Sequence, residues 1–160
     1  MAQLADFPLA DGGRVRLRRA ERGDLPAVLR LMADDAISRE RETSDLEPYE
    51  AAFAAIDADP AQLLVVGLAG KEVVCTLQLT VIPSLARSGA LRAQLEAVRV
   101  RSDHRGRGVG GELMRWALQE ARDRGCALVQ LTTDKRRTDA HRFYARWGFA
   151  ATHQGFKLQL

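Results

Sequence analysis

The stretch "VRVRSDHRGRGVGGELMRW" (residues 98–116) decides the fold, because it leads from a strand through a glycine-rich turn into a helix. Its first residues end an apolar, β-branched run at 91–100, and the apolar spacing becomes helical from Gly108 onward. Glycine tolerates backbone torsions that other residues resist, and the N–H groups at a helix N-terminus attract negative charge. We therefore predict that this loop binds phosphate.

Two common phosphate-binding motifs do not account for the loop. Gly106, Gly108 and Gly111 spell the GxGxxG fingerprint of dinucleotide-binding domains, and Asp134 lies near the expected ribose-binding acid. However, "RSDHR" separates the first glycine from its strand, and the 26 residues after Asp134 are too few to complete a doubly wound domain. A Walker loop is excluded because no Gly-Lys-Ser/Thr follows.

Length and composition indicate an ordinary globular protein. With 160 residues, 46% of them hydrophobic and 28% charged, we expect a single domain over 1–160. No apolar run approaches the ~20 residues of a membrane helix, and "MAQLADFPLADGG" lacks the features of a secretion signal. Cys75 and Cys126 sit in apolar runs without metal-ligand spacing, which predicts reduced thiols in a cytoplasmic protein and no metal site.

Charge is divided unevenly along the chain. Residues 1–80 hold 9 Lys and Arg against 14 Asp and Glu, whereas residues 81–160 hold 15 against 7. This division suits an anionic ligand on the second half and a cationic one on the first, although a solvated surface would explain the same counts.

The hydrophobic pattern predicts a mixed α/β fold built on one sheet. A helix is expected after Asp24, with Pro26 in its first turn, and a hairpin is expected around Gly70 and Lys71. The expected strands lie at 14–20, 62–69, 72–83, 91–100, 126–133 and 151–160, and the further expected helices at 44–60, 108–125 and 138–149.

Two motifs within this element order resemble the GNAT superfamily of N-acetyltransferases. Arg105-x-x-Gly108-x-Gly110 is similar to its pyrophosphate signature, Arg/Gln-x-x-Gly-x-Gly/Ala, and "HRFYARWGF" (141–149) is similar to its FYxxxGF ending. The resemblance implies a mostly antiparallel, twisted sheet of six or seven strands flanked by about four helices. The stretch 128–149 further resembles the aminoalkylphosphonate N-acetyltransferase branch.

The resemblance implies that the phosphate ligand is acetyl-CoA. Its pyrophosphate would lie on N–H groups of residues 106–111, its pantetheine arm along the strand, and its ribose 3′-phosphate against an arginine. Arg137 stands where many relatives carry an asparagine that contacts CoA, and it could reach phosphate instead. The cofactor-binding residues implied are Val98, Arg99, Val100, Arg105, Gly106, Arg107, Gly108, Val109, Gly110, Gly111, Arg137 and Tyr144.

Direct acetyl transfer to an amine needs a base for the amine and an acid for the leaving thiolate. The resemblance assigns the acid to Tyr144, a phenol with an ordinary pKa near ~10, and the base to Glu96. Tyr144 could equally be a packed helix residue, and Glu96 could pair with Arg92 or with an arginine of a neighbouring strand. His104 and His141 are weaker candidates for the base.

The acceptor is expected to be the primary amine of a small molecule. Met32, Glu40 and Tyr49 are candidate acceptor residues, and Arg136 or Arg137 would bind a phosphonate if the branch resemblance extends to substrate. A protein N-terminus or lysine is the alternative acceptor, and a non-catalytic acetyl-CoA sensor is the alternative of another class. No nucleic-acid or membrane partner is expected, whereas the edge of the closing strand "FKLQL" would permit a homodimer.

Overall fold

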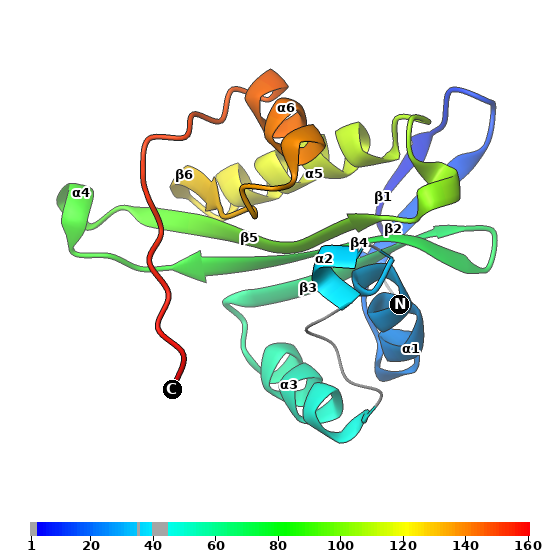
Figure 1. The fold of residues 1–160 in the computed structure, drawn as a ribbon, viewed down its shortest axis with the longest axis horizontal. Helices are drawn as coiled ribbons and strands as arrows, with labels where there is room; N and C mark the ends of the chain where they lie inside the picture. The colour runs from blue at the N-terminus through cyan, green and yellow to red at the C-terminus, as the bar shows by residue number, and fades with distance from the viewer. Residues whose placement is uncertain (1–2, 35, 40–44) are drawn as a thin grey trace.

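One sheet separates two helical layers in the computed structural model, which describes residues 3–34, 36–39 and 45–160. Helices α5 and α6 cover one face of the sheet, and α1 and α3 lie on the other (Figure 1). The strands are β1 (Gln3–Pro8), β2 (Arg14–Arg19), β3 (Gln62–Ala69), β4 (Glu72–Ile82), β5 (Leu91–Val100) and β6 (Cys126–Leu131). The helices are η1 (Arg22–Asp24), α1 (Leu25–Met32), α2 (Ala36–Arg39), α3 (Glu47–Ala58), α4 (Ala86–Gly89), η2 (Ser102–His104), α5 (Val109–Asp123) and α6 (Thr138–Arg146).

The six strands lie in chain order, each hydrogen-bonded to the next. All neighbours run antiparallel except β5 and β6, which are parallel because α5 carries the chain back across the sheet. The mixed α/β class and the mostly antiparallel sheet are therefore confirmed.

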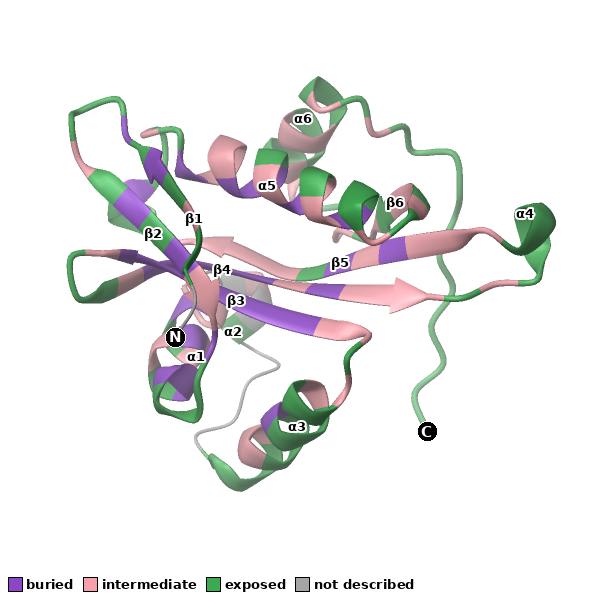
Figure 2. Cartoon of the chain, turned by 180° about the vertical axis from the view of Figure 1, so that it is seen from behind, coloured by how far each residue is buried: buried purple, intermediate pink, exposed green. Residues whose placement is uncertain are grey.

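Both faces of the central strands are buried, as Figure 2 shows for β3 and β4. Side chains alternate along a strand, so Leu63 and Val65 pack toward α5 while Leu64 and Val66 pack toward α1 and α3. A two-sided core explains why the hairpin reads as two nearly continuous apolar runs. Its turn falls at Gly70, as predicted, where a φ of 62° favours glycine.

Two sequence expectations about strands were wrong. Residues 3–8 form β1, which pairs with β2 and buries Phe7, although no strand was predicted there. Residues 151–160 were predicted to form a strand, but they adopt no regular structure and are exposed. Alternating apolar residues do not by themselves produce a strand, because the backbone N–H and C=O groups must also pair with a neighbouring strand.

Two kinds of feature are absent from the described residues. No helix there combines the length and apolar character needed to cross a membrane. No group of three or more His, Cys, Asp or Glu side chains in the same ranges has the arrangement of a metal site.

Candidate active site

A bulge bends β5 away from β6 at the point where the candidate site begins. Leu77 of β4 faces two residues of β5, Ala97 and Val98, and Ala97 has a φ of 49°, which is strained for alanine. Pairing between β5 and β6 stops at Leu95 and Leu131. The last residues of β5 therefore lie beside an opening, where their backbone groups are available to a ligand.

The glycine loop crosses from this opening to the start of α5. Gly106 and Gly108 have φ values of 75° and 90°, which lie in the left-handed region that glycine tolerates, and Gly108 precedes the first residue of α5. The first intrahelical bond comes from the N–H of Glu112, which donates to the Gly108 carbonyl at 3.1 Å. The N–H groups before it point outward together, and the helix dipole favours an anion there.

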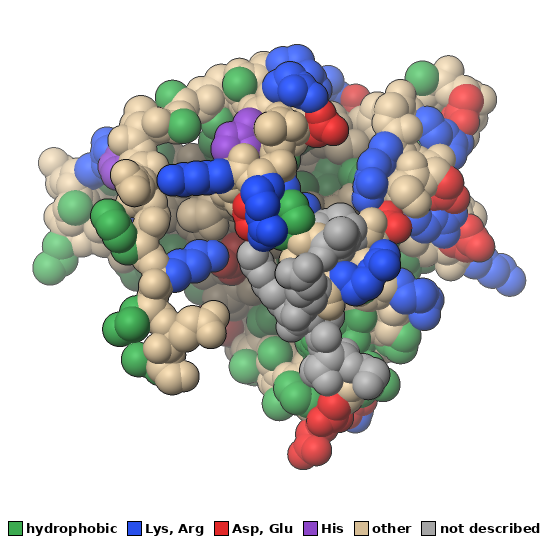
Figure 3. Space-filling view, viewed as in Figure 1, with side chains coloured by type: hydrophobic (Ala, Val, Ile, Leu, Met, Phe, Trp, Pro, Cys, Tyr) green, Lys and Arg blue, Asp and Glu red, His purple; other side chains and the backbone are tan. Residues whose placement is uncertain are grey.

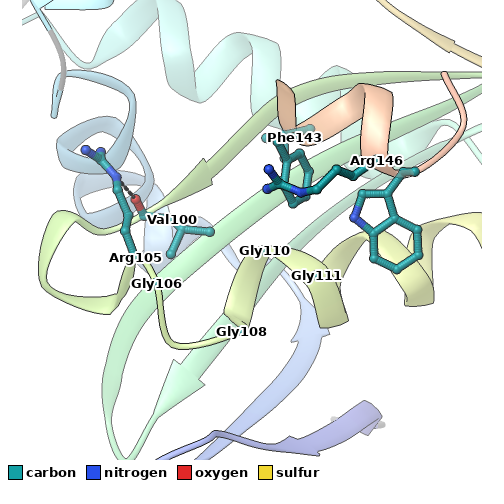
Figure 4. Close-up of a pocket in the computed structure, with 10 residues that line it drawn as sticks. Val100, Arg105, Gly106, Gly108, Gly110, Gly111, Phe143 and Arg146 are labelled. Carbon is teal, nitrogen blue, oxygen red and sulfur yellow. Dashed lines mark hydrogen bonds between the residues drawn. The ribbon is translucent and has the colours of Figure 1, made fainter. Parts of the chain in front are cut away.

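The loop forms one wall of a cavity of about 470 Å³, and α6 forms the opposite wall (Figure 4). A Cβ atom added to Gly110 would lie 3.6 Å from Phe143 and 3.7 Å from Val100, so any side chain there would fill the space between them. The absent side chain leaves room for a ligand to reach the backbone. The cavity is lined by Val98, Val100, Arg105, Gly106, Gly108, Gly110, Gly111, Phe143, Arg146 and Trp147.

The arginines of the loop are engaged with the protein itself. The Arg105 side chain donates to the Val100 carbonyl at 3.0 Å and to Asp34 at 2.9 Å, so its guanidinium holds the loop against β5 and α1 (Figure 4). Arg107 forms an ion pair with Asp11 of the β1–β2 turn. The positions of Arg105 and Arg107 therefore do not favour the expectation that a loop arginine binds the ribose phosphate. Arg105 contributes to the cradle mainly through its backbone.

Three cavity residues were missed by sequence reasoning. Phe143, Arg146 and Trp147 share one face of α6, and the Arg146 guanidinium carbon lies 6.0 Å from the centroid of the Phe143 ring. Figure 4 shows Phe143 and Arg146 facing the glycines across the cavity. Their spacing of three and four residues was a usable signal, because such residues lie on the same side of a helix.

Tyr144 lies next to this cavity and is half-buried. Its ring meets Phe143 edge-on at 5.3 Å and Phe149 at 5.8 Å. Burial raises the pKa of the Tyr144 phenol above its ordinary value, while the positive charges of Arg99 and Arg137 oppose that rise. The phenol is thus protonated at neutral pH, as a general acid must be.

Glu96 differs from the sequence interpretation in its surroundings. Glu96 lies within the apolar run 91–100, but its side chain is exposed on the face of β5 opposite α5. The bulge at Ala97 follows it directly. No ion pair joins Glu96 to Arg92, both of which the structure describes. Exposure at the opening leaves the carboxylate accessible to an incoming amine.

The other titratable candidates have structural surroundings. His104 is buried with Nδ1 at 2.7 Å from Asp103, and His141 Nε2 lies 3.0 Å from the Asp134 carbonyl oxygen. Burial raises the pKa of the Cys75 thiol to about 12 and raises that of Cys126 as well. Both cysteines are free thiols.

Two of the candidate acceptor residues, Met32 and Tyr49, lie on the side of the sheet that carries α1 and α3. Met32 ends α1 and is partly buried against the core there, and Tyr49 lies in the first turn of α3. Glu40 falls outside the described residues.

Comparisons with known proteins show which family the chain belongs to. A model of the Acetyltransferase (GNAT) family matches residues 26–149. The chain belongs to the GNAT acetyltransferase family. It is accordingly an acyltransferase, and the matched range includes both the glycine loop and α6.

The chain is also similar to a named enzyme and to two solved structures. The aminoalkylphosphonate N-acetyltransferase of Salmonella typhimurium is 33% identical over 116 residues, which cover 72% of this chain and 75% of that protein. The crystal structure of a transcriptional regulator from Bacillus halodurans C-125 is 43% identical, with a TM-score of 0.87 over 91% of this chain and 99% of that one. A putative acetyltransferase from Agrobacterium tumefaciens is 30% identical, with a TM-score of 0.79 over 90% and 99%.

Proposed function

We propose that this chain, as one catalytic domain, transfers the acetyl group of acetyl-CoA to the primary amine of a small molecule. The observation that carries the proposal is the cavity between the glycine cradle and α6, whose lining residue Phe143 contacts the ring of Tyr144. The cradle suits the pyrophosphate, and the apolar lining beyond it suits the pantetheine arm. A cytoplasmic location is part of the proposal, since it agrees with two free thiols.

Acetyl-CoA supplies a thioester whose acetyl group an amine can take directly. The N–H groups of residues 106–111 would hold its pyrophosphate, and the backbone of residues 98–100 would orient its arm beside the bulge. Glu96 would take the proton of the amine, directly or through water, and the Tyr144 hydroxyl would donate a proton to the departing sulfur. Neither thiol is needed as a nucleophile, and burial keeps Cys75 protonated.

The acceptor is proposed to carry an acidic group in addition to its amine. The charges of Arg99 and Arg137 reach Tyr144, so an anion near the opening would be attracted. Of the two arginines considered for this role, Arg136 donates two hydrogen bonds of 3.0 Å to Asp134, and the charge of Arg137 reaches Tyr144. Figure 3 shows Lys and Arg side chains on the face that carries α6. The Salmonella relative is an aminoalkylphosphonate N-acetyltransferase, and its name points to the same class of acceptor.

The test is the release of thiol from acetyl-CoA across matched amines. Aminoalkylphosphonates, amino acids, unsubstituted alkylamines of equal length, polyamines, aminoglycosides and short peptides would be compared with an amine-free control. Turnover confined to amines with an acidic group supports the whole proposal. Turnover of alkylamines and polyamines alone retains the transferase and removes the acidic acceptor.

Silence across that panel, with acetyl-CoA bound, would reject small-molecule transfer. Acetylation of protein N-termini or lysines would then identify a protein acceptor, and its absence would leave a sensor module. A DNA mobility-shift assay belongs beside it, because one relative is described as a transcriptional regulator.

A further inference from the structure

A second cavity, of about 740 Å³, is separate from the one that the glycine loop borders. It lies where α1, the β3–β4 turn and η2 meet at one end of the molecule (Figure 1). The two cavities share no lining residue. Seven of the twelve residues that line the second cavity are charged, and its volume suits a small molecule. A ligand of this cavity would therefore be small and polar.

Each acidic side chain of this wall already has a cation of the protein beside it. The four carboxylates are held by three arginines, at distances of 2.6 to 2.9 Å between nitrogen and oxygen. The pairs are Asp24 with Arg18, Asp34 with Arg105, Glu72 with Arg101 and Asp103 with Arg101. A cationic ligand would have to compete with these arginines for every carboxylate.

Two cations of the wall, in contrast, have no acidic partner. Arg30 of α1 and Lys71 of the β3–β4 turn form no ion pair with any residue in the described ranges. Both side chains are exposed, so they are free to turn toward a ligand. The exposed Ser102 of η2 brings a hydroxyl group to the same wall. Three different elements thus offer hydrogen-bond donors, two of them charged, to a molecule in this cavity.

The chemistry of these donors favours a phosphate group. A guanidinium binds phosphate through two parallel hydrogen bonds, and an ammonium group binds it as a point charge. A phosphate monoester carries about two negative charges at neutral pH and has three strong acceptor oxygens. It can therefore neutralise Arg30 and Lys71 together and still accept the Ser102 hydroxyl, whereas a single carboxylate carries one charge. The cavity is larger than a phosphate group, which leaves room for an organic remainder.

We propose that this cavity binds a small phosphate monoester, and that the bound ester weakens the glycine cradle. Asp34 lines the second cavity, and Arg105, to which it is hydrogen-bonded at 2.9 Å, lines the first. An anion beside Asp34 competes with that carboxylate for Arg105 and so loosens the bond that holds the loop. Acetyl-CoA affinity should fall about two- to fivefold, because a partly exposed pair of this kind contributes modestly. The coupling rests on the proposed cofactor, whereas the binding of the ester does not.

Amide NMR of the full chain, titrated with glycerol 3-phosphate, tests the binding, and glycerol is the uncharged control. Saturable shifts are expected at Gly23, Lys71 and Ser102, which line the second cavity. Shifts confined to Gly106 and Gly110 would place the phosphate on the cradle and overturn the second site. The absence of saturable shifts would overturn it as well.

Paired substitutions test which cations hold the ester. Arg30→Gln with Lys71→Gln should weaken its binding about tenfold or more, since two charge-assisted donors are lost. Arg122→Gln with Lys157→Gln removes the same charge from exposed positions outside both cavities and is the matched control. Unchanged circular dichroism spectra would verify that both variants fold. Equal affinities for the ester in the two variants would overturn the site.

Calorimetric titration of acetyl-CoA, with and without saturating glycerol 3-phosphate, tests the coupling. The ester should lower the affinity of the wild type and of the control variant, but not that of Arg30→Gln with Lys71→Gln. A loss that persists in that variant would show direct competition at the cradle, and an unchanged wild-type affinity would refute the coupling. A chain that binds the ester but no acetyl-CoA would reject the proposed cofactor, and the coupling with it, but not the ester site.

Discussion

Arg105 donates a hydrogen bond of 2.9 Å to Asp34, although 71 positions separate the two residues in the sequence. The same carboxylate accepts the backbone N–H of Ser102 at 3.0 Å. Asp34 follows α1, so these two bonds fasten the glycine loop to the layer that bears the candidate acceptor residues. Arg105 is the first residue of the family signature. Its side chain thereby holds the glycine loop against the layer that carries Met32 and Tyr49.

Asp34→Asn should weaken acetyl-CoA binding about two- to fivefold, because the pair is partly exposed and such pairs contribute modestly. Calorimetric titration measures the affinity, and the rate at saturation should change little. Glu50→Gln removes the exposed pair between Glu50 and Arg22 and is the matched control. Equal affinities in both variants would show that the loop keeps its place without Asp34.

Gly108→Ala and Gly125→Ala form a matched pair, since both glycines have positive φ and open space around an added Cβ. Each alanine should cost about 1–2 kcal/mol of unfolding free energy from backbone strain. Only Gly108→Ala should also reduce acetyl-CoA affinity, by roughly tenfold or more, because the cradle is formed by the backbone. Thermal unfolding and titration together would separate the two effects. If Gly125→Ala lost acetyl-CoA affinity to the same extent, the loss in Gly108→Ala would be explained by lower stability and not by the cradle.

Tyr144→Phe should lower kcat by about 100-fold or more, the usual contribution of a positioned acid, with acetyl-CoA affinity nearly unchanged. The two rings have the same shape, so packing against Phe143 and Phe149 persists. Tyr49→Phe removes the chain's other phenol and should leave the acid step intact. An unimpaired Tyr144→Phe enzyme would mean that the sulfur takes its proton from another source.

The pH dependence follows from the burial of Tyr144. Because the raised pKa favours the neutral phenol, the folded state holds this proton more tightly than the unfolded state. The resulting stability is fully present below the ordinary pKa of 10 and is lost as pH rises toward the folded value. Between pH 8 and pH 11, the midpoint temperature of thermal unfolding should fall more steeply for the wild type than for Tyr144→Phe. The kcat profile should stay free of a basic decline from this group up to about pH 10.

Arg146→Ala should weaken acetyl-CoA binding roughly tenfold, as expected for a lost charge-assisted hydrogen bond to phosphate. Binding by the wild type should also fall more steeply with salt than binding by the variant. Arg142→Ala is the control, because Arg142 lies on the same helix and pairs with Asp139. If both variants bind alike, the phosphate contacts lie elsewhere on the cavity wall.

Much of the helical framework could be predicted because its determinants are local. Pro26 after Asp24 indicates the start of α1, and the strand–glycine–helix order around Gly108 indicates an anion cradle, whatever the rest of the chain does. β1 was missed because its residues Gln3–Pro8 alternate weakly and depend on β2 for their pairing.

The side-chain partners could not be predicted from spacing. Arg105 appears in the sequence as a phosphate ligand, but Asp34 and the Val100 carbonyl occupy its guanidinium. Arg146 was not predicted as a site residue, yet α6 places it in the cavity wall. Glu96 lies in an apolar strand, yet its side chain is exposed on the face of β5 opposite α5.

The sequence by itself indicated an anion-binding loop and the order of the main strands and helices between residues 14 and 146, since glycine torsions and hydrophobic periods are properties of short stretches. Only the tertiary structure decided which cation lines the cavity, where the bulge at Ala97 separates β5 from β6, and that residues 151–160 find no strand within their own chain. Those outcomes depend on contacts between residues far apart in sequence, and a periodic pattern carries no information about which of them will meet.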